Sequence, residues 1–101
     1  MTEITTEKLI ELQTENKKIL LEIYGDWCAP CRMLMPKLES IEEKYSDISF
    51  LKMNIDKNKP FIDEMGIRSI PFVMFYDGKK LIDTIVGLNS TSRYEEILKI
   101  L

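Results

Sequence analysis

The stretch GDWCAPCRMLMPKLESI, residues 25–41, contains the only two cysteines of the chain, Cys28 and Cys31. The preceding run KILLEIYG (18–25) is short and almost continuously apolar, which is typical of a strand covered on both faces. Beyond the cysteines, apolar residues recur at helical spacing, namely Leu34, Leu38, Ile41 and Tyr45. The sequence therefore predicts that a buried strand ends just before the cysteine pair and that a helix over 29–45 begins at it.

A position at the start of a helix favours redox chemistry at Cys28. The first four N–H groups of a helix lack intrahelical partners, and the helix dipole adds roughly half a positive charge there. Both effects favour a thiolate, so we expect a lowered pKa and a nucleophilic sulfur at Cys28. Cys31 follows almost one turn later, close enough to attack a mixed disulfide formed at Cys28. Pro30 is tolerated between them because the N–H that it lacks would have been unpaired anyway.

The spacing of the cysteine pair alone also fits two roles without redox chemistry. The cysteines could be buried and unreactive, or they could be half of a zinc site. Zinc usually takes four protein ligands, and the chain offers two thiols and no histidine, so the remaining ligands would be carboxylates or come from a second chain. We expect no metal. The lack of histidine also excludes Cys–His proteolytic chemistry.

Composition limits the partners and the location of the protein. The chain has 101 residues, which suits one domain spanning 1–101. Its 14 Lys and Arg against 17 Asp and Glu give a net charge of -3, too mild to indicate binding to nucleic acid or to an acidic membrane. The start MTEITTEKLIEL does not resemble a signal peptide, and no stretch approaches the ~18 apolar residues of a membrane span. We therefore expect a cytoplasmic protein, whose thiols are kept reduced.

The rest of the pattern predicts a mixed α/β fold. A weak first strand precedes a helix capped by Thr5 or Thr6, whose inward face would carry Leu9, Ile10 and Leu12. The following pattern predicts, in order, a strand over 48–56, a short helix over 58–66, a hairpin over 71–87 with its turn at Asp77–Gly78, and a last helix capped by Ser90 or Ser92. The strand–helix–strand passage implies a parallel pair, and the hairpin adds antiparallel strands. We therefore expect helices on both faces of a mixed sheet.

Four motifs together resemble the thioredoxin family. They are WCAPC (27–31), MNID (53–56), GIRSIP (66–71) and YDGK with its later VG (76–79 and 86–87). The resemblance covers nearly the whole chain, from about Thr5 to Leu101. It implies a thioredoxin fold, with a mixed sheet of four or five strands flanked by four helices. It also implies reversible disulfide exchange with protein substrates, a thioredoxin reductase as electron donor, no cofactor beyond the redox-active cysteine pair, and a monomer.

The resemblance also implies roles for individual residues. Cys28 resembles the attacking thiol and Cys31 the resolving thiol. Trp27 matches the tryptophan that shields the disulfide, and Pro71 matches the loop proline that faces it. The family indicates a cis bond between Ile70 and Pro71, although only about 5–6% of such bonds are cis, and this would expose the backbone of Ile70 to an extended substrate segment.

Further residues fall on family positions near the expected site. An apolar patch around Cys28 would bind substrates and would comprise Trp27, Ala29, Pro30, Met65, Ile70 and Gly87. Pro36 matches a proline that bends the long helix, and Lys52 and Asp56 match supporting polar positions.

Met33, Met35, Met53 and Met74 are expected to fill the core or its border.

Glu22 is the departure from the family with the greatest chemical consequence, because thioredoxins usually have a buried Asp beneath the cysteines. Burial would raise the pKa of Glu22 and allow it to take a proton from Cys31, directly or through water. Lys52 would be the charge partner of Glu22. The alternative is an exposed Glu22 on a strand edge. A smaller departure is Ala29 where Gly is usual, which favours the helical state by about 1 kcal/mol.

The expected activity is the reduction of protein disulfides through Cys28 and Cys31. Two alternative functions use the same residues. One is an oxidase or isomerase with a higher reduction potential, and the second is a non-catalytic binding subunit of a larger enzyme.

Overall fold

β2 (Lys18–Tyr24) is the central strand of a five-stranded sheet in the order β1-β3-β2-β4-β5. The computed structural model describes all residues, 1–101. The other strands are β1 (Thr2–Glu3), β3 (Ile48–Asn54), β4 (Phe72–Asp77) and β5 (Lys80–Val86). β3 pairs in parallel with both β1 and β2, whereas β4 runs antiparallel to β2 and to β5. The sheet is therefore mixed, as the sequence predicted.

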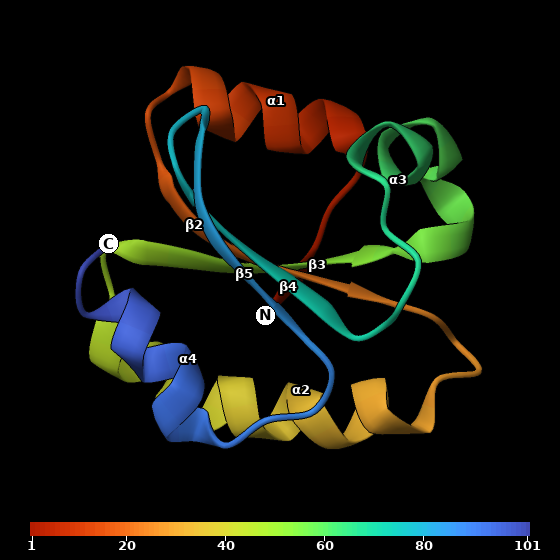
Figure 1. Ribbon diagram of the computed structural model, residues 1–101. Helices are drawn as coiled ribbons and strands as arrows, with labels where there is room; N and C mark the ends of the chain where they lie inside the picture. Colours follow the sequence, from red (N-terminus) through yellow and green to blue (C-terminus); the bar gives the residue numbers. More distant parts are fainter.

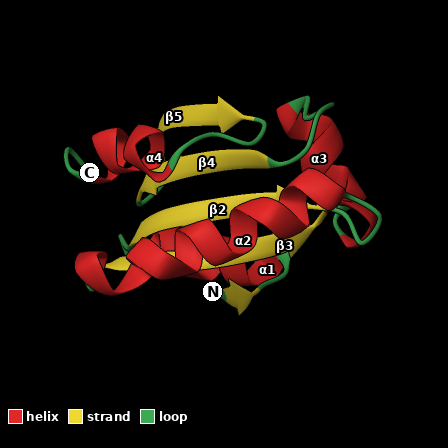
Figure 2. Ribbon diagram, turned by 90° about the horizontal axis from the view of Figure 1, so that it is seen from below, coloured by secondary structure: helices red, strands yellow, loops and turns green.

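Four helices cover the two faces of this sheet: α1 (Thr6–Thr14), α2 (Ala29–Glu42), α3 (Lys59–Met65) and α4 (Thr91–Leu98). Figure 1 shows α1 and α3 on one side of the sheet and α2 and α4 on the other. Seen from below, α2 lies across β2 and β3, and α4 lies beside the hairpin of β4 and β5 (Figure 2). The predicted arrangement of four helices around a mixed sheet is confirmed. None of the helices has the length and hydropathy needed to cross a bilayer.

Alternation along β2 divides the core into two apolar layers. Leu20 belongs to a cluster of 12 buried residues that includes Leu34, Leu38 and Ile41 of α2. Ile19, Leu21 and Ile23 point to the other face and belong to a cluster of 11 buried residues that includes Leu9 of α1 and Ile62 of α3. Because successive side chains of a strand alternate between faces, Glu22 lies on the same face as Leu20.

The helix ends follow the residues that mark them in the sequence. Thr5 caps α1, and its side chain accepts a hydrogen bond from the N–H of Lys8. Gly66 closes α3 in the left-handed conformation, with φ 67°, which glycine adopts without steric cost. Ser90 is the N-cap of α4, although its side chain bonds Ser92 rather than a backbone N–H.

Some local predictions were wrong. Ile10 is 56% exposed, because the helix places Leu9 and Leu12 inward and turns Ile10 away from the sheet. The hairpin turn is centred on Gly78 and Lys79, one residue later than expected, because Asp77 still pairs with Lys80. Met33 is 57% exposed and so is not core filler.

The predicted helix over 29–45 forms, but its last turn changes type. The α-helix α2 ends at Glu42, and residues Glu43–Tyr45 form a 3-10 turn. Pro36 lies inside α2 without ending it. Proline removes one helical hydrogen bond at this point, because it has no N–H to donate to the carbonyl of Arg32.

Candidate functional site

Cys28 and Cys31 form a disulfide at the N-terminus of α2, with their Cα atoms 5.3 Å apart. Cys28 is the N-cap residue, and its Sγ accepts a hydrogen bond from the N–H of Cys31 at 3.2 Å. Both side chains are buried, with 4% of Cys28 and 1% of Cys31 exposed. A sulfur that caps a helix receives the N–H groups that the helix leaves unpaired, and this stabilises negative charge on it. The predicted location of the pair is confirmed.

The loop before α2 is fixed by a tight approach of backbone and side chains. A Cβ on Gly25 would lie 3.0 Å from Cδ1 of Ile70 and 3.1 Å from Cε2 of Trp27, so a side chain there would require both neighbours to shift by a few tenths of an ångström. Trp27 is 68% exposed, and its Nε1 donates a hydrogen bond to Oδ2 of Asp56 at 3.4 Å. Ala29 and Pro30 are exposed in the first turn of α2. Trp27, Ala29 and Pro30 therefore form the exposed surface beside the disulfide.

Asn54 connects this loop to the segment after β3. It is buried, its Oδ1 accepts the backbone N–H of Asp56 at 2.8 Å, and its Nδ2 donates to Oδ1 of Asp26 at 3.3 Å. Asp56 is exposed and bonds Trp27. Asn54 therefore holds Asp26 and Asp56 in place on either side of the tryptophan.

The segment Ile70–Pro71 carries the predicted cis peptide bond. The carbonyl of Pro71 accepts the N–H of Gly87 at 2.8 Å, and the carbonyl of Gly87 accepts the hydroxyl of Tyr94 at 3.0 Å. Gly87 has φ 85°, a conformation that side-chain-bearing residues rarely adopt. Neither the N–H nor the carbonyl of Ile70 forms a hydrogen bond within the protein. The backbone of Ile70 is therefore free to pair with another chain.

Glu22 lies beneath α2, fully buried, between Lys52 of β3 and Val73 of β4 in the sheet. Its two carboxylate oxygens have no hydrogen-bond partner. The pKa of Glu22 is raised to about 7, mainly by burial; the charge of Lys52 partly opposes this rise, and the charge of Glu39 adds a smaller contribution to it. The expectation of a buried Glu22 with a raised pKa is confirmed, and the alternative of an exposed strand-edge position is wrong.

Lys52 does not form the expected ion pair with Glu22. Its Nζ donates to Sδ of Met35 at 3.6 Å and lies 5.8 Å from the centroid of the Tyr24 ring. The hydroxyl of Tyr24 in turn donates to the carboxylate of Glu3 on β1. The ammonium group therefore contacts a thioether and an aromatic face, although Lys52 is the direct neighbour of Glu22 in the register of β2 and β3.

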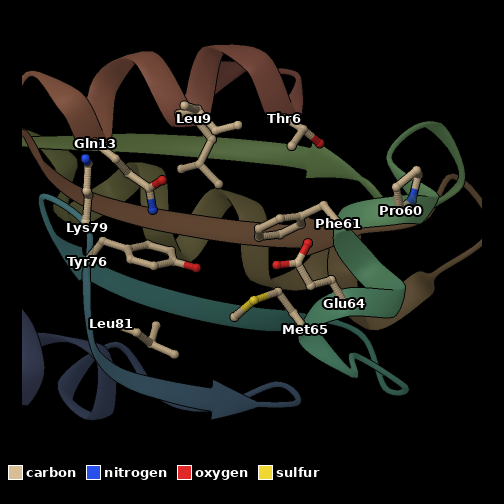
Figure 3. A pocket seen from close by; sticks show the side chains of 11 residues that line it. Thr6, Leu9, Gln13, Pro60, Phe61, Glu64, Met65, Tyr76, Lys79 and Leu81 are labelled. Carbon is tan, nitrogen blue, oxygen red and sulfur yellow. The ribbon is translucent and has the colours of Figure 1, made fainter.

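Met65 is placed differently from the other residues of the predicted patch. It is 36% exposed and lines a cavity of about 390 Å³ between α1, α3 and the β4–β5 hairpin, on the face of the sheet opposite α2. Figure 3 shows Met65 there with Leu9, Tyr76 and Leu81. None of the other predicted site residues lines this cavity. The largest hollow of the molecule therefore lies away from the disulfide.

Sequence reasoning assigned no role in this site to three residues that shape it: Gly25, Asn54 and Met35. The first two had a visible signal, because Gly25 ends the predicted strand segment 18–25 just before the cysteine motif and Asn54 lies within the MNID motif. Met35 gave no such signal, since only the folded structure brings its sulfur to Lys52.

Comparison with known proteins gives one consistent family. The family model described as Thioredoxin matches residues 3–99. A thioredoxin of Mycoplasmoides gallisepticum is 34% identical over 100 residues, which cover 98% of this chain and 100% of the relative, and one of Porphyra purpurea is 36% identical over 89 residues, covering 87% and 83%. Among solved structures, oxidised mitochondrial thioredoxin 3 of Saccharomyces cerevisiae has a TM-score of 0.90 at 27% identity, covering 100% of this chain and 95% of that one. Thioredoxin of Fasciola hepatica has a TM-score of 0.87 at 28% identity and covers 98% of both chains.

Proposed function

The chain belongs to the thioredoxin family of oxidoreductases that reduce protein disulfides, and on this basis we propose the role of each residue in the exchange. Cys28 is the nucleophile, Cys31 is the resolving thiol and Glu22 is the proton acceptor. The observation that carries this assignment is the hydrogen bond from the Cys31 N–H to Sγ of Cys28 at the start of α2. The same N–H stabilises a thiolate on Cys28 once the disulfide is reduced.

The exchange takes two steps. In the first, the Cys28 thiolate attacks one sulfur of the substrate disulfide, a mixed disulfide forms, and the other substrate sulfur leaves as a thiolate. In the second, Cys31 loses its proton to Glu22 and attacks Sγ of Cys28, which releases the second substrate thiolate and leaves the Cys28–Cys31 disulfide. Two electrons pass from the protein to its substrate.

Glu22 suits this second step because a pKa of about 7 lets it accept a proton near neutral pH and lose it again to solvent. Its position on β2, beneath the helix that carries Cys31, supports this role. Water can relay the proton where the two groups do not touch directly.

Substrates bind as extended segments against the loop of Pro71. The free N–H and carbonyl of Ile70 offer two hydrogen bonds to a peptide backbone, so affinity depends little on substrate sequence. Trp27, Ala29 and Pro30 add apolar contact beside the disulfide, and Gly87 fixes the Pro71 carbonyl. Met65 would contribute only to partners that extend past α3.

A thioredoxin reductase returns the two electrons, so that the protein carries electrons between that enzyme and its substrates. We place the protein in the cytoplasm, as a monomer. Support for a reducing compartment comes from cysteine usage, because both thiols belong to the redox pair and none is left to stabilise the fold elsewhere.

Reduction of insulin by the protein and its two serine variants tests these roles. Cys28→Ser is expected to lose all turnover and to form no mixed disulfide, because the attacking thiol is gone and the remaining thiol, Cys31, is only 1% exposed. Cys31→Ser is expected to lose turnover as well, but to accumulate a mixed disulfide with insulin that mass spectrometry detects. Mixed disulfide in Cys28→Ser with none in Cys31→Ser would reverse the assignment.

A further inference from the structure

The Lys52 ammonium group does not pair with Glu22, although its position on β3 would allow it to do so. Lys52 is paired with Glu22 in the register of two adjacent parallel strands, and both side chains lie on the α2 face of the sheet. An ammonium group on a four-carbon stem can reach a carboxylate one strand away, yet no ion pair forms. Instead Nζ lies 3.6 Å from Sδ of Met35 and 5.8 Å from the centroid of the Tyr24 ring.

Both of these contacts are favourable for a cation but leave its charge unneutralised. A thioether is a weak hydrogen-bond acceptor, and an aromatic face attracts an ammonium group within about 6 Å. Tyr24 is itself fixed by its hydrogen bond to Glu3, and Met35 is fixed by its place in α2. The Tyr24 ring and the Met35 sulfur therefore compete with the carboxylate of Glu22 for the Lys52 ammonium group.

We propose that Met35 is a positioning residue, which together with Tyr24 holds the Lys52 ammonium group away from Glu22 and so keeps the buried carboxylate unpaired and able to take a proton. The inference rests on the proposed role of Glu22 as the proton acceptor. It adds a residue outside the cysteine pair, Met35, whose thioether acts on Glu22 only through Lys52.

The alternative position of Lys52 would weaken Glu22 as a base. A carboxylate with an opposite charge within a few ångströms binds its proton about tenfold or more less tightly. A Glu22 paired in this way would stay ionised throughout the neutral range, and it would draw a proton from Cys31 less effectively. With Lys52 in its observed position, Glu22 has a pKa of about 7; burial raises it, and the charge of Lys52 lowers it only in part.

The other groups that face Glu22 do not replace Lys52. Glu39 on α2 carries the same charge as Glu22 and raises its pKa. Tyr94 on α4 is neutral, because burial, and to a lesser extent the charge of Glu22, raise its pKa. Val73, the neighbour of Glu22 on β4, is apolar, and Cys31 is the proposed proton donor. Lys52 is thus the cation that acts on Glu22, and its distance from the carboxylate sets how strongly it opposes the effect of burial.

The test compares two substitutions of Met35 in the reduced, full-length protein. Met35→Leu keeps the volume but removes the acceptor, and volume-conserving hydrophobic swaps of this kind are tolerated best. Met35→Gln keeps the length and offers a carbonyl oxygen to Lys52. The titration of Glu22 is followed by NMR of carbon-13-labelled carboxyl groups, and the pH profile of insulin reduction is measured beside it.

Met35→Leu is expected to lower the proton affinity of Glu22 about tenfold or more, whereas Met35→Gln leaves it near that of the parent protein. Met33→Leu, on the exposed side of the same helix, is the matched control and should leave the titration unchanged. In a Lys52→Met background, Met35→Leu should have no further effect, because Met35 acts only through Lys52. A folded Met35→Leu protein with an unchanged Glu22 titration would overturn the inference.

Two further results separate this inference from the proposed function. If Glu22 titrates at lower pH in Met35→Leu but the pH profile of insulin reduction does not move, Met35 positions Lys52 and the role of Glu22 as proton acceptor is lost. A measurement without any variant also tests the contact: a nuclear Overhauser effect between the Met35 methyl group and the Lys52 side chain is expected, and its absence would contradict the proposal.

Discussion

The two faces of β2 are equally buried but serve different purposes. On the α1 and α3 side, the strand contributes Ile19, Leu21 and Ile23 to a cluster of 11 buried hydrophobic residues. On the α2 and α4 side, it contributes Leu20 and then Glu22, a buried carboxylic acid without a partner. A fold needs only the first arrangement, since burying a charge without a partner costs stability. The buried, unpartnered Glu22 is therefore explained by a role in the reaction and not by a contribution to stability.

The comparison extends to the surfaces above the two layers. The α1 and α3 face has the larger hollow, but the residues around it offer no reactive sulfur. The α2 face has no comparable hollow but presents the disulfide at a helix end, beside a free stretch of backbone at Ile70. For a protein that exchanges disulfides with large partners, an accessible edge matters more than a deep pocket.

The largest expected effect is a loss of stability caused by a substitution in the layer beneath α1 and α3, which should leave the chemistry unchanged. Met53 is fully buried in the α1 and α3 layer, and Met53→Ala is expected to lower the free energy of unfolding by about 2–5 kcal/mol, because it leaves a cavity. Denaturant titration measures this loss. Insulin reduction by the folded fraction should keep its pH profile, and a shifted profile would show that the two faces are not independent.

A smaller effect is the pH dependence of stability that Glu22 imposes on the oxidised protein. Burial raises the pKa of Glu22 from 4.5 to about 7 in the folded state, so between these values the folded protein keeps a proton that the unfolded chain has lost. The free energy of unfolding should therefore fall as pH rises from about 4.5 to 7, by about 3 kcal/mol in total, and then level off. Glu22→Gln should abolish this fall.

In this protein, the effect of Glu22 on stability between about pH 4.5 and 7 overlaps little with the titration of other groups. The chain has no histidine, and cysteines in a disulfide do not titrate, so few other groups change charge between pH 5 and 7. Denaturant titrations of both proteins across this range measure the effect. Parallel pH curves for the parent protein and Glu22→Gln would show that Glu22 is not the group responsible.

The smallest of the three effects concerns the rate of reduction. Glu22→Gln is expected to slow insulin reduction about tenfold at pH 8, equivalent to about 1.4 kcal/mol, because the thiol of Cys31 must then lose its proton to water. At pH 6 the difference should shrink, since Glu22 is then mostly protonated in the parent protein too. An equal rate for both proteins across pH 6–8 would remove Glu22 from the mechanism.

Patterns in the sequence predicted the elements of the fold well because each depends on local spacing. The buried strand before the cysteines and the glycine that closes α3 lie where residue type and periodicity placed them, and the caps Thr5 and Ser90 are each one of the two candidates that the sequence offered. The errors lie where neighbours in space decide. Ile10 fits an apolar face in the sequence, but its exposure depends on how α1 sits on the sheet.

The candidate site was predictable in its residues but not in its contacts. The motif located Cys28 and Cys31, and the family resemblance implied the cis bond before Pro71 and a buried Glu22. The partner of Lys52 was not predictable, because opposite charges suggest an ion pair and only the packing of α2 against β3 brings Met35 closer. Contacts between side chains far apart in sequence need the folded structure.

The proposed chemistry depends above all on the stabilisation of a thiolate at the helix end that Cys28 caps. The most direct test is the rate at which iodoacetamide alkylates Cys28 in the reduced Cys31→Ser protein, measured from pH 4 to 10. We predict a half-maximal rate well below pH 8.5, the ordinary midpoint of a cysteine. A midpoint at about 8.5, no different from that of a free thiol, would contradict this chemistry.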